Sequence, residues 1–457
     1  MPAKSFDYRE SQKEPFIKSI FTNKNVRNRI LFTLVIFFIY RLGSEIPVPN
    51  IDLDSIGETS GLISMMNLLG GGAMDNMSIF ALGLTPYITA SIIIQLLSMD
   101  VIPPLTELAK SGKKGKRKLD KYTRYLALVL CFVQSYTMTL ALSDGSDSIL
   151  INSDFSGYLY VSTVFTAGTM FLLWLADRIS MYGIGNGVSM IIFAGIVADI
   201  PYEFAEAFST LTAGTSGSAL FNGVLTFIGF ILIYLLIIVL VVFMTKAERR
   251  LPLQFTNSTN ASQNNEKQYL PLKINSASVI PVIFANAVML APVQIITIGI
   301  NYDWFDSSTV TDTLYNLLQM ESVESLVIYA VLIILFTFFY TKLQVDPEKI
   351  AQNLKDANVY IPPIPPGKET EKYINTVLSR ITVLGALFLT VIALLPNVAP
   401  MIITSLPSSI RLGGTGIIIV VGVAIETSDQ IRGLVNQKKS RGFGFRNGED
   451  PFGRKVK

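Results

Sequence analysis

The side chains that usually carry out enzyme chemistry are scarce in this sequence. It has no histidine, and its single cysteine, Cys131, lies in an apolar run. Imidazole acid–base chemistry, an internal disulfide and multi-cysteine metal sites are therefore excluded. No apolar segment contains paired acids, and the His-Glu and Gly-x-Ser-x-Gly motifs of hydrolases are absent. We expect no catalytic residue, no metal and no cofactor, and do not expect an enzyme.

Gly183-Ile-Gly-Asn-Gly187 is a glycine motif that could suggest phosphate binding. A phosphate-cradling loop of this kind follows a strand and precedes a helix in a βαβ unit. Here both neighbours are long apolar segments, so the motif predicts a tight turn between two helices.

Hydroxyl and amide side chains gather in one apolar segment, 77–99. They include Thr85, Thr89, Ser91, Gln95 and Ser98. Such side chains avoid lipid and face a bundle interior or an aqueous path. Helix–helix packing through small polar residues is the alternative explanation.

The composition indicates that these residues belong to a protein that crosses a membrane many times. Half of the 457 residues are apolar and 16% are charged, whereas about a quarter are charged in typical soluble domains. A membrane-spanning helix needs roughly 20 mostly apolar residues. The candidates are 28–41, 77–99, 122–142, 158–176, 187–200, 220–244, 279–300, 323–341, 381–395 and 413–433. The fifth rises only about 21 Å, so it lies inside the bundle or extends into polar ends.

Charges alternate between the connecting segments. Lysine and arginine concentrate before the first candidate, in 110–124, in 246–273, in 342–380 and after the last candidate, and acids dominate the other connections. Positively charged loops stay in the cytoplasm, so both termini are predicted to be cytoplasmic. A division into five and five segments permits an inverted repeat.

The segment 61–75 is apolar but too short to span a membrane, and it contains a triple glycine at 70–72. It is predicted either to enter the membrane partway or to lie on its external surface. The segment 348–372 holds four lysines, four acids and the proline-rich run 361–367, which is stiff and serves either as a docking surface or as a spacer.

The sequence resembles the SecY family of protein-translocation channels over about residues 21–442. The most specific stretches are 78–95, 168–174, 183–197, 270–275 with 279–284, and 413–415. The resemblance implies an all-α membrane protein in which ten helices form a clamshell of two inverted five-helix halves, with a short plug helix. The implied division is a cytoplasmic N-terminal segment 1–27, an N-terminal half 28–200, an external hinge loop 201–219, a C-terminal half 220–433 with cytoplasmic loops 245–275 and 342–380, and a cytoplasmic tail 434–457.

The resemblance also implies roles for individual residues. The pore waist is an aliphatic ring of Leu84, Ile88, Val188, Ile192, Ile283 and Ile419. The plug, within about 61–75, contains Leu62, Ile63, Met65, Met66, Leu68 and Leu69. The second and seventh segments form a lateral gate, with Thr89, Gln95 and Asn286 as polar gate residues.

The implied activity is passive passage of unfolded secretory proteins across the bacterial plasma membrane, and lateral release of membrane proteins into lipid. The implied partners are SecE, SecG, the SecA ATPase, the ribosome and client polypeptides with signal sequences, besides membrane lipid; no DNA partner is expected.

Two departures from the family pattern concern docking: Pro365 replaces an arginine, and 256–265 is uncharged where a basic tip is frequent. We therefore expect Arg249, Arg250, Lys368 and Lys372 to carry partner contacts. The alternative explanation is that these residues only keep their loops in the cytoplasm. The alternatives are an accessory channel with a dedicated motor and, less favoured because no charge pair lies within the membrane, a secondary solute transporter.

Overall fold

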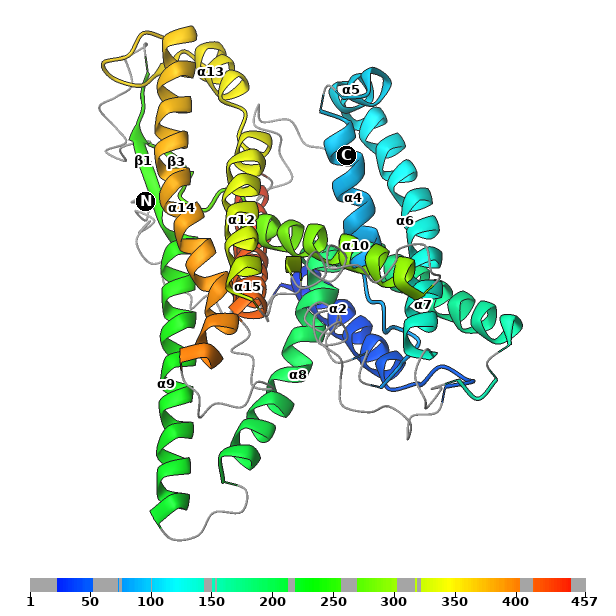
Figure 1. Cartoon of the computed structure of the whole chain (residues 1–457). Coiled ribbons are helices and arrows are strands. Elements are labelled where there is room, and N and C mark those ends of the chain that lie inside the picture. Colours follow the sequence, from blue (N-terminus) through cyan, green and yellow to red (C-terminus); the bar gives the residue numbers. More distant parts are fainter. Residues whose placement is uncertain are drawn as a thin grey trace, which may run out of the picture.

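A computed structural model describes residues 23–51, 73, 76–99, 101–143, 150–152, 154–212, 218–255, 269–301, 317–318, 322–402 and 414–444. Each of the ten predicted segments coincides with a helix (Figure 1). In chain order these are α2 (Lys24–Ser44), α4 (Thr85–Leu97), α6 (Gly112–Ser143), α7 (Phe155–Tyr182), α8 (Gly187–Thr212), α9 (Ser218–Lys246), α10 (Ile280–Asn301), α12 (Val323–Gln344), α14 (Lys368–Ile402) and α15 (Gly414–Gly444). The short helices α5 (Pro103–Lys110) and α13 (Pro347–Asp356) lie between them.

The second predicted segment begins as a helix later than expected. Residues 76–84 form turns, and α4 starts only at Thr85. Gly83 adopts a φ of +56°, a left-handed conformation. A right-handed helix cannot continue through this residue, so the preceding residues are not part of α4. Pro86 then occupies the first turn of α4, where its missing N–H costs no helical hydrogen bond.

Other helices are longer than the apolar pattern predicts. The fifth segment was predicted either to be a short helix inside the bundle or to extend into polar residues. Helix α8 continues through Pro201 to Thr212, so the second prediction is confirmed. The predicted hinge loop 201–219 is thus largely helical. Likewise α14 begins at Lys368, thirteen residues before the predicted apolar start, with Glu369 and Glu371 in its first turn. Acids there interact favourably with the helix dipole.

The helices form two groups that meet at the centre of the molecule. The helices α2, α4, α6, α7 and α8 pack on one another, and so do α9, α12, α14 and α15. In Figure 1, α10 crosses from α12 to α4 and α6, and it contacts all three. Contacts of α15 with α8 and α2 complete the connection. One hydrophobic core, which draws on both groups, occupies this meeting point.

Four short strands join two distant parts of the chain. Strand β1 (Glu248–Pro252) pairs antiparallel with β3 (Tyr269–Lys273), and β2 (Gln254–Phe255) pairs with β4 (Val359–Tyr360). The Tyr360 hydroxyl also donates to Gln254 Oε1 over 3.0 Å. The two predicted cytoplasmic loops are therefore one structural unit, which we call the cytoplasmic lobe: β1 to β4, α13 and the start of α14.

Five helices within the described residues are long and apolar enough to cross a membrane. They are α7, α8, α9, the helical stretch Val323–Asp356 that includes α12, and α14. The strongest candidate is α9, with a mean hydropathy of 3.3. Its side chains are mostly exposed in the isolated chain, as expected for a helix that faces lipid.

Candidate functional site

The six residues predicted to line a pore waist lie in the core where the two helix groups meet. Leu84, Ile88, Ile192 and Ile419 are buried members of that core, and Val188 and Ile283 pack against it half-buried. They come from four elements: the start and first turns of α4, and α8, α10 and α15. The structure thus brings the six side chains into one cluster. Their action as a ring around a passage stays a prediction.

Polar side chains of α4 satisfy their hydrogen bonds within the helix itself. Thr89 Oγ1 donates to the carbonyl oxygen of Thr85 over 3.1 Å, and Gln95 Nε2 donates to Ser91 Oγ over 3.2 Å. Helix α4 packs against α10. Because these polar groups find partners on their own helix, separating α4 from α10 breaks none of these bonds.

Asn286 contrasts with the polar residues of α4. It lies on α10, it is 3% exposed, and its side-chain oxygen has no hydrogen-bond partner among the described residues. Its helix neighbours Phe284, Ala285 and Ala287 belong to the hydrophobic core. A buried acceptor without a partner costs roughly 1–3 kcal/mol, and access of water to this site removes that cost.

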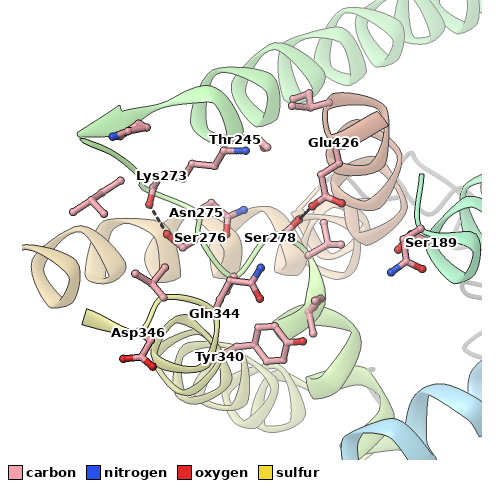
Figure 2. A pocket seen from close by; sticks show the side chains of 18 of the residues that line it. Ser189, Thr245, Lys273, Asn275, Ser276, Ser278, Tyr340, Gln344, Asp346 and Glu426 are labelled. Atoms are coloured by element: carbon pink, nitrogen blue, oxygen red, sulfur yellow. Dashed lines mark hydrogen bonds between the residues drawn. The ribbon is translucent and has the colours of Figure 1, made fainter. Parts of the chain in front are cut away.

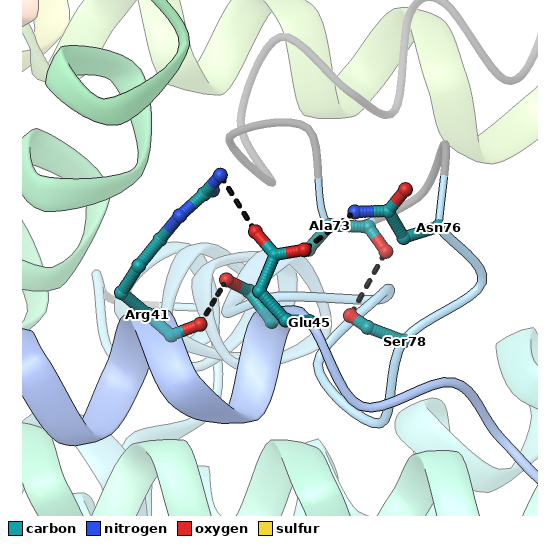
Figure 3. Close-up of polar contacts among 6 residues, drawn as sticks. Arg41, Glu45, Ala73, Asn76 and Ser78 are labelled. Carbon is teal, nitrogen blue, oxygen red and sulfur yellow. Dashed lines mark hydrogen bonds and ion pairs between the residues drawn. The ribbon is translucent and has the colours of Figure 1, made fainter.

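The predicted plug residues Leu62, Ile63, Met65, Met66, Leu68 and Leu69 lie outside the described residues. The chain just after them is fixed to the end of α2. Asn76 Nδ2 donates to Glu45, which also forms an ion pair with Arg41 at 2.6 Å (Figure 3). The Ser78 hydroxyl donates to the carbonyl oxygen of Ala73 over 2.9 Å. The segment that returns to the helices after 61–72 is therefore held in a defined position.

The glycine motif 183–187 forms a tight turn between α7 and α8, as predicted. At Gly187 a Cβ atom would lie 1.7 Å from the carbonyl oxygen of Ala176, so only glycine fits this close approach of the helices. The turn also contacts other elements: Thr33 of α2 accepts from Ile184 N over 3.1 Å, and Gln430 of α15 accepts from Gly185 N. The turn therefore connects α2 with α15 through residues in the interior of both helices.

The predicted docking residues all lie on the cytoplasmic lobe and are exposed. Arg249 and Arg250 lie on β1, and Lys368 and Lys372 lie in the first turns of α14. Leu251, Leu272, Ile361 and Ile374 form a small core that joins β1, β3, the segment after β4 and α14. The structure therefore places the two arginines and the two lysines on one folded unit.

Some lobe cations already have partners. Arg250 Nε bonds to Glu248 Oε1 at 2.7 Å, which raises the arginine pKa, and its guanidinium lies 4.7 Å from the Tyr269 ring centroid. Lys372 Nζ lies 3.4 Å from Glu369.

The segment 256–265, with its missing basic tip, is outside the described residues. Pro365 is exposed, and its carbonyl oxygen accepts from the Thr370 hydroxyl over 2.8 Å.

Sequence reasoning missed the strands of the lobe and a polar pocket beside it. The strands are two to five residues long, and β1 and β3 both contain proline, so no alternating pattern announces them. The pocket depends on side chains from six helices and from β3. The sequence signal near it is the run 275–278, in which three of four residues are polar.

Comparison with known proteins agrees with this architecture. The sequence model of the SecY family matches residues 78–428. The chain is 42% identical to protein translocase subunit SecY 1 of Lactobacillus kefiranofaciens over 93% of this chain and 99% of that protein, and 42% identical to protein translocase subunit SecY of Staphylococcus aureus over 94% and 99%.

Solved structures share the fold at low sequence identity. A protein-conducting channel superposes with a TM-score of 0.59 at 18% identity, covering 89% of this chain and 92% of that one. The idle yeast Ssh1 complex bound to the yeast 80S ribosome gives 0.61 at 14% identity, with coverage of 88% and 89%. The helices described above are thus arranged as in these channels.

Proposed function

This chain belongs to the SecY family, and we propose that it forms the pore through which a translocase passes unfolded polypeptides across a membrane. The observation that carries the proposal is the cluster of Leu84, Ile88, Val188, Ile192, Ile283 and Ile419 where the two helix groups meet. Two similar bacterial proteins carry the name protein translocase subunit SecY.

An aliphatic waist suits a passage for polypeptides of any sequence. A narrow apolar constriction expels water and so blocks ions when no chain occupies it. Isoleucine and leucine offer no hydrogen bond or charge that would hold a passing segment. The channel itself is passive in this mechanism, and the driving force comes from a motor ATPase or from the translating ribosome.

Lateral release into lipid is assigned to the interface of α4 and α10. The hydrogen bonds of Thr89 and Gln95 lie within α4, so its separation from α10 breaks neither of them. The buried amide of Asn286 favours the separated state, because water or a client's backbone then satisfies its oxygen. The segment 61–75 is assigned as the plug. One similar structure is titled for a plug domain that stabilises the closed state of a translocation channel.

The cytoplasmic lobe is the proposed docking surface for SecA or the ribosome, with Arg249, Arg250, Lys368 and Lys372 as contacts. Its exposure and its basic residues support this assignment. Among the similar structures are Sec61 in a canine ribosome–channel complex and the ribosome-bound yeast Ssh1 complex. SecE and SecG are the proposed membrane partners. The proposed location is the bacterial plasma membrane, with both termini in the cytoplasm.

An accessory channel with a dedicated motor is the second candidate. Pro365, which replaces the arginine that the family pattern leads us to expect, favours it.

Reconstitution tests the proposed function. The full chain, purified with its membrane partners and placed in vesicles, is expected to move a signal-bearing precursor into the lumen when motor and ATP are added. Protease protection measures the amount transported. A vesicle preparation that shows intact complex and a bound motor but protects no precursor would contradict the proposal.

A further inference from the structure

The glycine turn 183–187 is held from two sides by side chains of other helices. On one side, the Thr33 hydroxyl of α2 accepts from Ile184 N over 3.1 Å. On the other side, the Gln430 side-chain oxygen of α15 accepts from Gly185 N. Helix α2 packs with α7 and α8, whereas α15 packs with α9 and α14. The turn is therefore a place where the two helix groups are joined by hydrogen bonds to adjacent backbone groups.

Further contacts show that α8 and α15 run antiparallel beside each other. The Thr427 hydroxyl of α15 donates to Met190 Sδ of α8 over 3.5 Å. Further along α8, a Cβ atom on Gly416 would lie 3.1 Å from Ile196 Cγ2, so the two helices approach closely there. The contacts advance along α8 while they go back along α15. These two helices, which belong to different groups, therefore meet in a defined register.

Two predicted ring residues lie on this pair of helices, between the outer contacts. Ile192 of α8 and Ile419 of α15 are both buried members of the central core. Gln430 follows Ile419 by eleven residues, which is three helical turns, so both residues lie on the same face of α15. Val188, a third predicted ring residue, follows Gly185 by three residues. The position of the turn relative to α15 therefore determines how these ring residues meet.

Close packing does not enclose this end of the helix pair on every side. The polar pocket, about 760 Å³ in volume, lies beside it and is lined by residues of α8 and α15, among them Ser189 and Glu426 (Figure 2). Glu426 accepts from the Ser278 hydroxyl over 3.0 Å. An open space provides no packing contacts to the helices that border it. The hydrogen bonds of Gln430 and Thr427 therefore matter more at this end than they would in a close-packed contact.

We propose that Gln430 is a positioning residue for the ring. Its hydrogen bond to the Gly185 backbone holds α8 against α15 in the register at which Ile192 and Ile419 close the waist. Gln430 acts through α8 and needs no contact with a client. Without the bond, α8 can shift along α15, the aliphatic side chains meet less closely, and water enters the waist. A dry apolar waist blocks ions, whereas a wetted one conducts them. This inference rests on the proposed function, which assigns these side chains to the waist.

The test compares Gln430→Leu, which removes the acceptor, with Gln430→Glu, which keeps an acceptor at the same side-chain length. Gln430 is exposed and Gly185 is half-buried, so water can reach the freed N–H and we expect the fold to be retained. Gln430→Leu should raise the ion conductance of the resting complex in planar bilayers roughly two- to tenfold, the range that loss of one hydrogen bond implies. Gln430→Glu should conduct like the wild type. The control is Gln352→Leu on α13, an exposed glutamine that bonds to Asp356 of its own helix, and it should leave conductance unchanged.

Hydrogen–deuterium exchange of the same complexes measures the bond itself. The Gly185 amide should exchange faster in Gln430→Leu than in the wild type and at the wild-type rate in Gln430→Glu, while exchange within α9 stays unchanged. Wild-type conductance of Gln430→Leu, an equal leak of both Gln430 variants, or unchanged exchange at Gly185 would overturn the inference. If the wild-type complex transports no precursor, the proposed function fails, whereas conductance and amide exchange still decide whether Gln430 positions α8 against α15.

Discussion

Single side chains at the meeting point of the two helix groups set the proposed balance between closed and open states. Four of the six predicted ring residues are buried, and Ile419 is 2% exposed. Burial of aliphatic groups favours the closed arrangement by about 25 cal/mol for each Å² removed from water. The Asn286 side-chain oxygen, which has no hydrogen-bond partner among the described residues, disfavours the closed arrangement. The channel is thus expected to respond to substitutions at either kind of position, in opposite directions.

Replacing Ile419 with asparagine should make the closed channel leak. An amide buried without a partner costs about 1–3 kcal/mol, which corresponds to a 5- to 150-fold shift toward the open state. We expect greater ion conductance in planar bilayers and transport of precursors with defective signal sequences. Ile418→Asn is the matched control, since Ile418 is equally buried on α15 but is not a predicted ring residue. Equal conductance of the two variants would contradict the assignment.

Replacing Asn286 with leucine should have the opposite effect. The change removes the unsatisfied oxygen, keeps the number of side-chain heavy atoms and should stabilise the closed state by about 1–3 kcal/mol. Transport of precursors with weak signal sequences is expected to fall more than transport of those with strong ones. Asn222→Leu, at an exposed position of α9, serves as the control. An increase in transport of weak-signal precursors by Asn286→Leu would count against a gate at this position.

The residues themselves reveal these roles only in part. Isoleucines of the ring look like any other apolar residue of their segments, and only the resemblance to a family distinguishes Ile419 from Ile418. The intrahelical bonding of Thr89 follows from a local spacing of four residues, whereas the isolation of the Asn286 oxygen depends on how distant helices pack. Sequence can suggest the first and not the second.

At the level of elements, hydrophobic length predicts the helices better than it predicts their ends. All ten segments are confirmed as helices because a long apolar run leaves few alternatives. The polar extensions of α8 and α14 carry no such signal. The lobe could not be predicted from the sequence for another reason. Strands β2 and β4 are two residues long and lie about a hundred residues apart in the chain, so their pairing depends on the fold of both loops.

Because the lobe is one unit, reversing the charge of both Arg249 and Arg250 should weaken motor binding. We expect Arg249→Glu with Arg250→Glu to reduce motor-driven transport several-fold and to lower motor affinity, more strongly at low salt because these residues are exposed. Co-sedimentation of the motor with vesicles measures affinity, and protease protection checks topology.

The pair Lys116→Glu with Arg117→Glu makes the same change in charge at exposed positions of α6, outside the lobe, and serves as the control. Unchanged motor affinity in a correctly oriented Arg249 and Arg250 variant would remove these residues from the docking surface. The variant Pro365→Arg restores the arginine that the family pattern leads us to expect. If it increases transport driven by a generic SecA, the native loop is adapted to a different, specialised motor.

At the level of the whole molecule, the proposed function assigns separate tasks to three parts of the structure. The lobe and the polar pocket lie on the predicted cytoplasmic side, the apolar cluster lies at the meeting point of the helix groups, and the fixed segment 76–78 follows the predicted plug. Helix α10 touches the pocket, the cluster and α4. Helix α10 thus connects the pocket with the proposed gate and the proposed waist.

The most direct test of this account is whether a client in transit touches the ring. Cys131→Ser removes the only native cysteine, and single cysteines then replace Ile88, Ile283 or Ile419. A precursor arrested by a folded C-terminal domain, with one cysteine in the arrested stretch, should form a disulfide with each of the three. It should form none with Leu236→Cys on α9, where the native leucine is 60% exposed. Transport that proceeds with no disulfide at any ring position, or with one at Leu236 alone, would contradict the central claim.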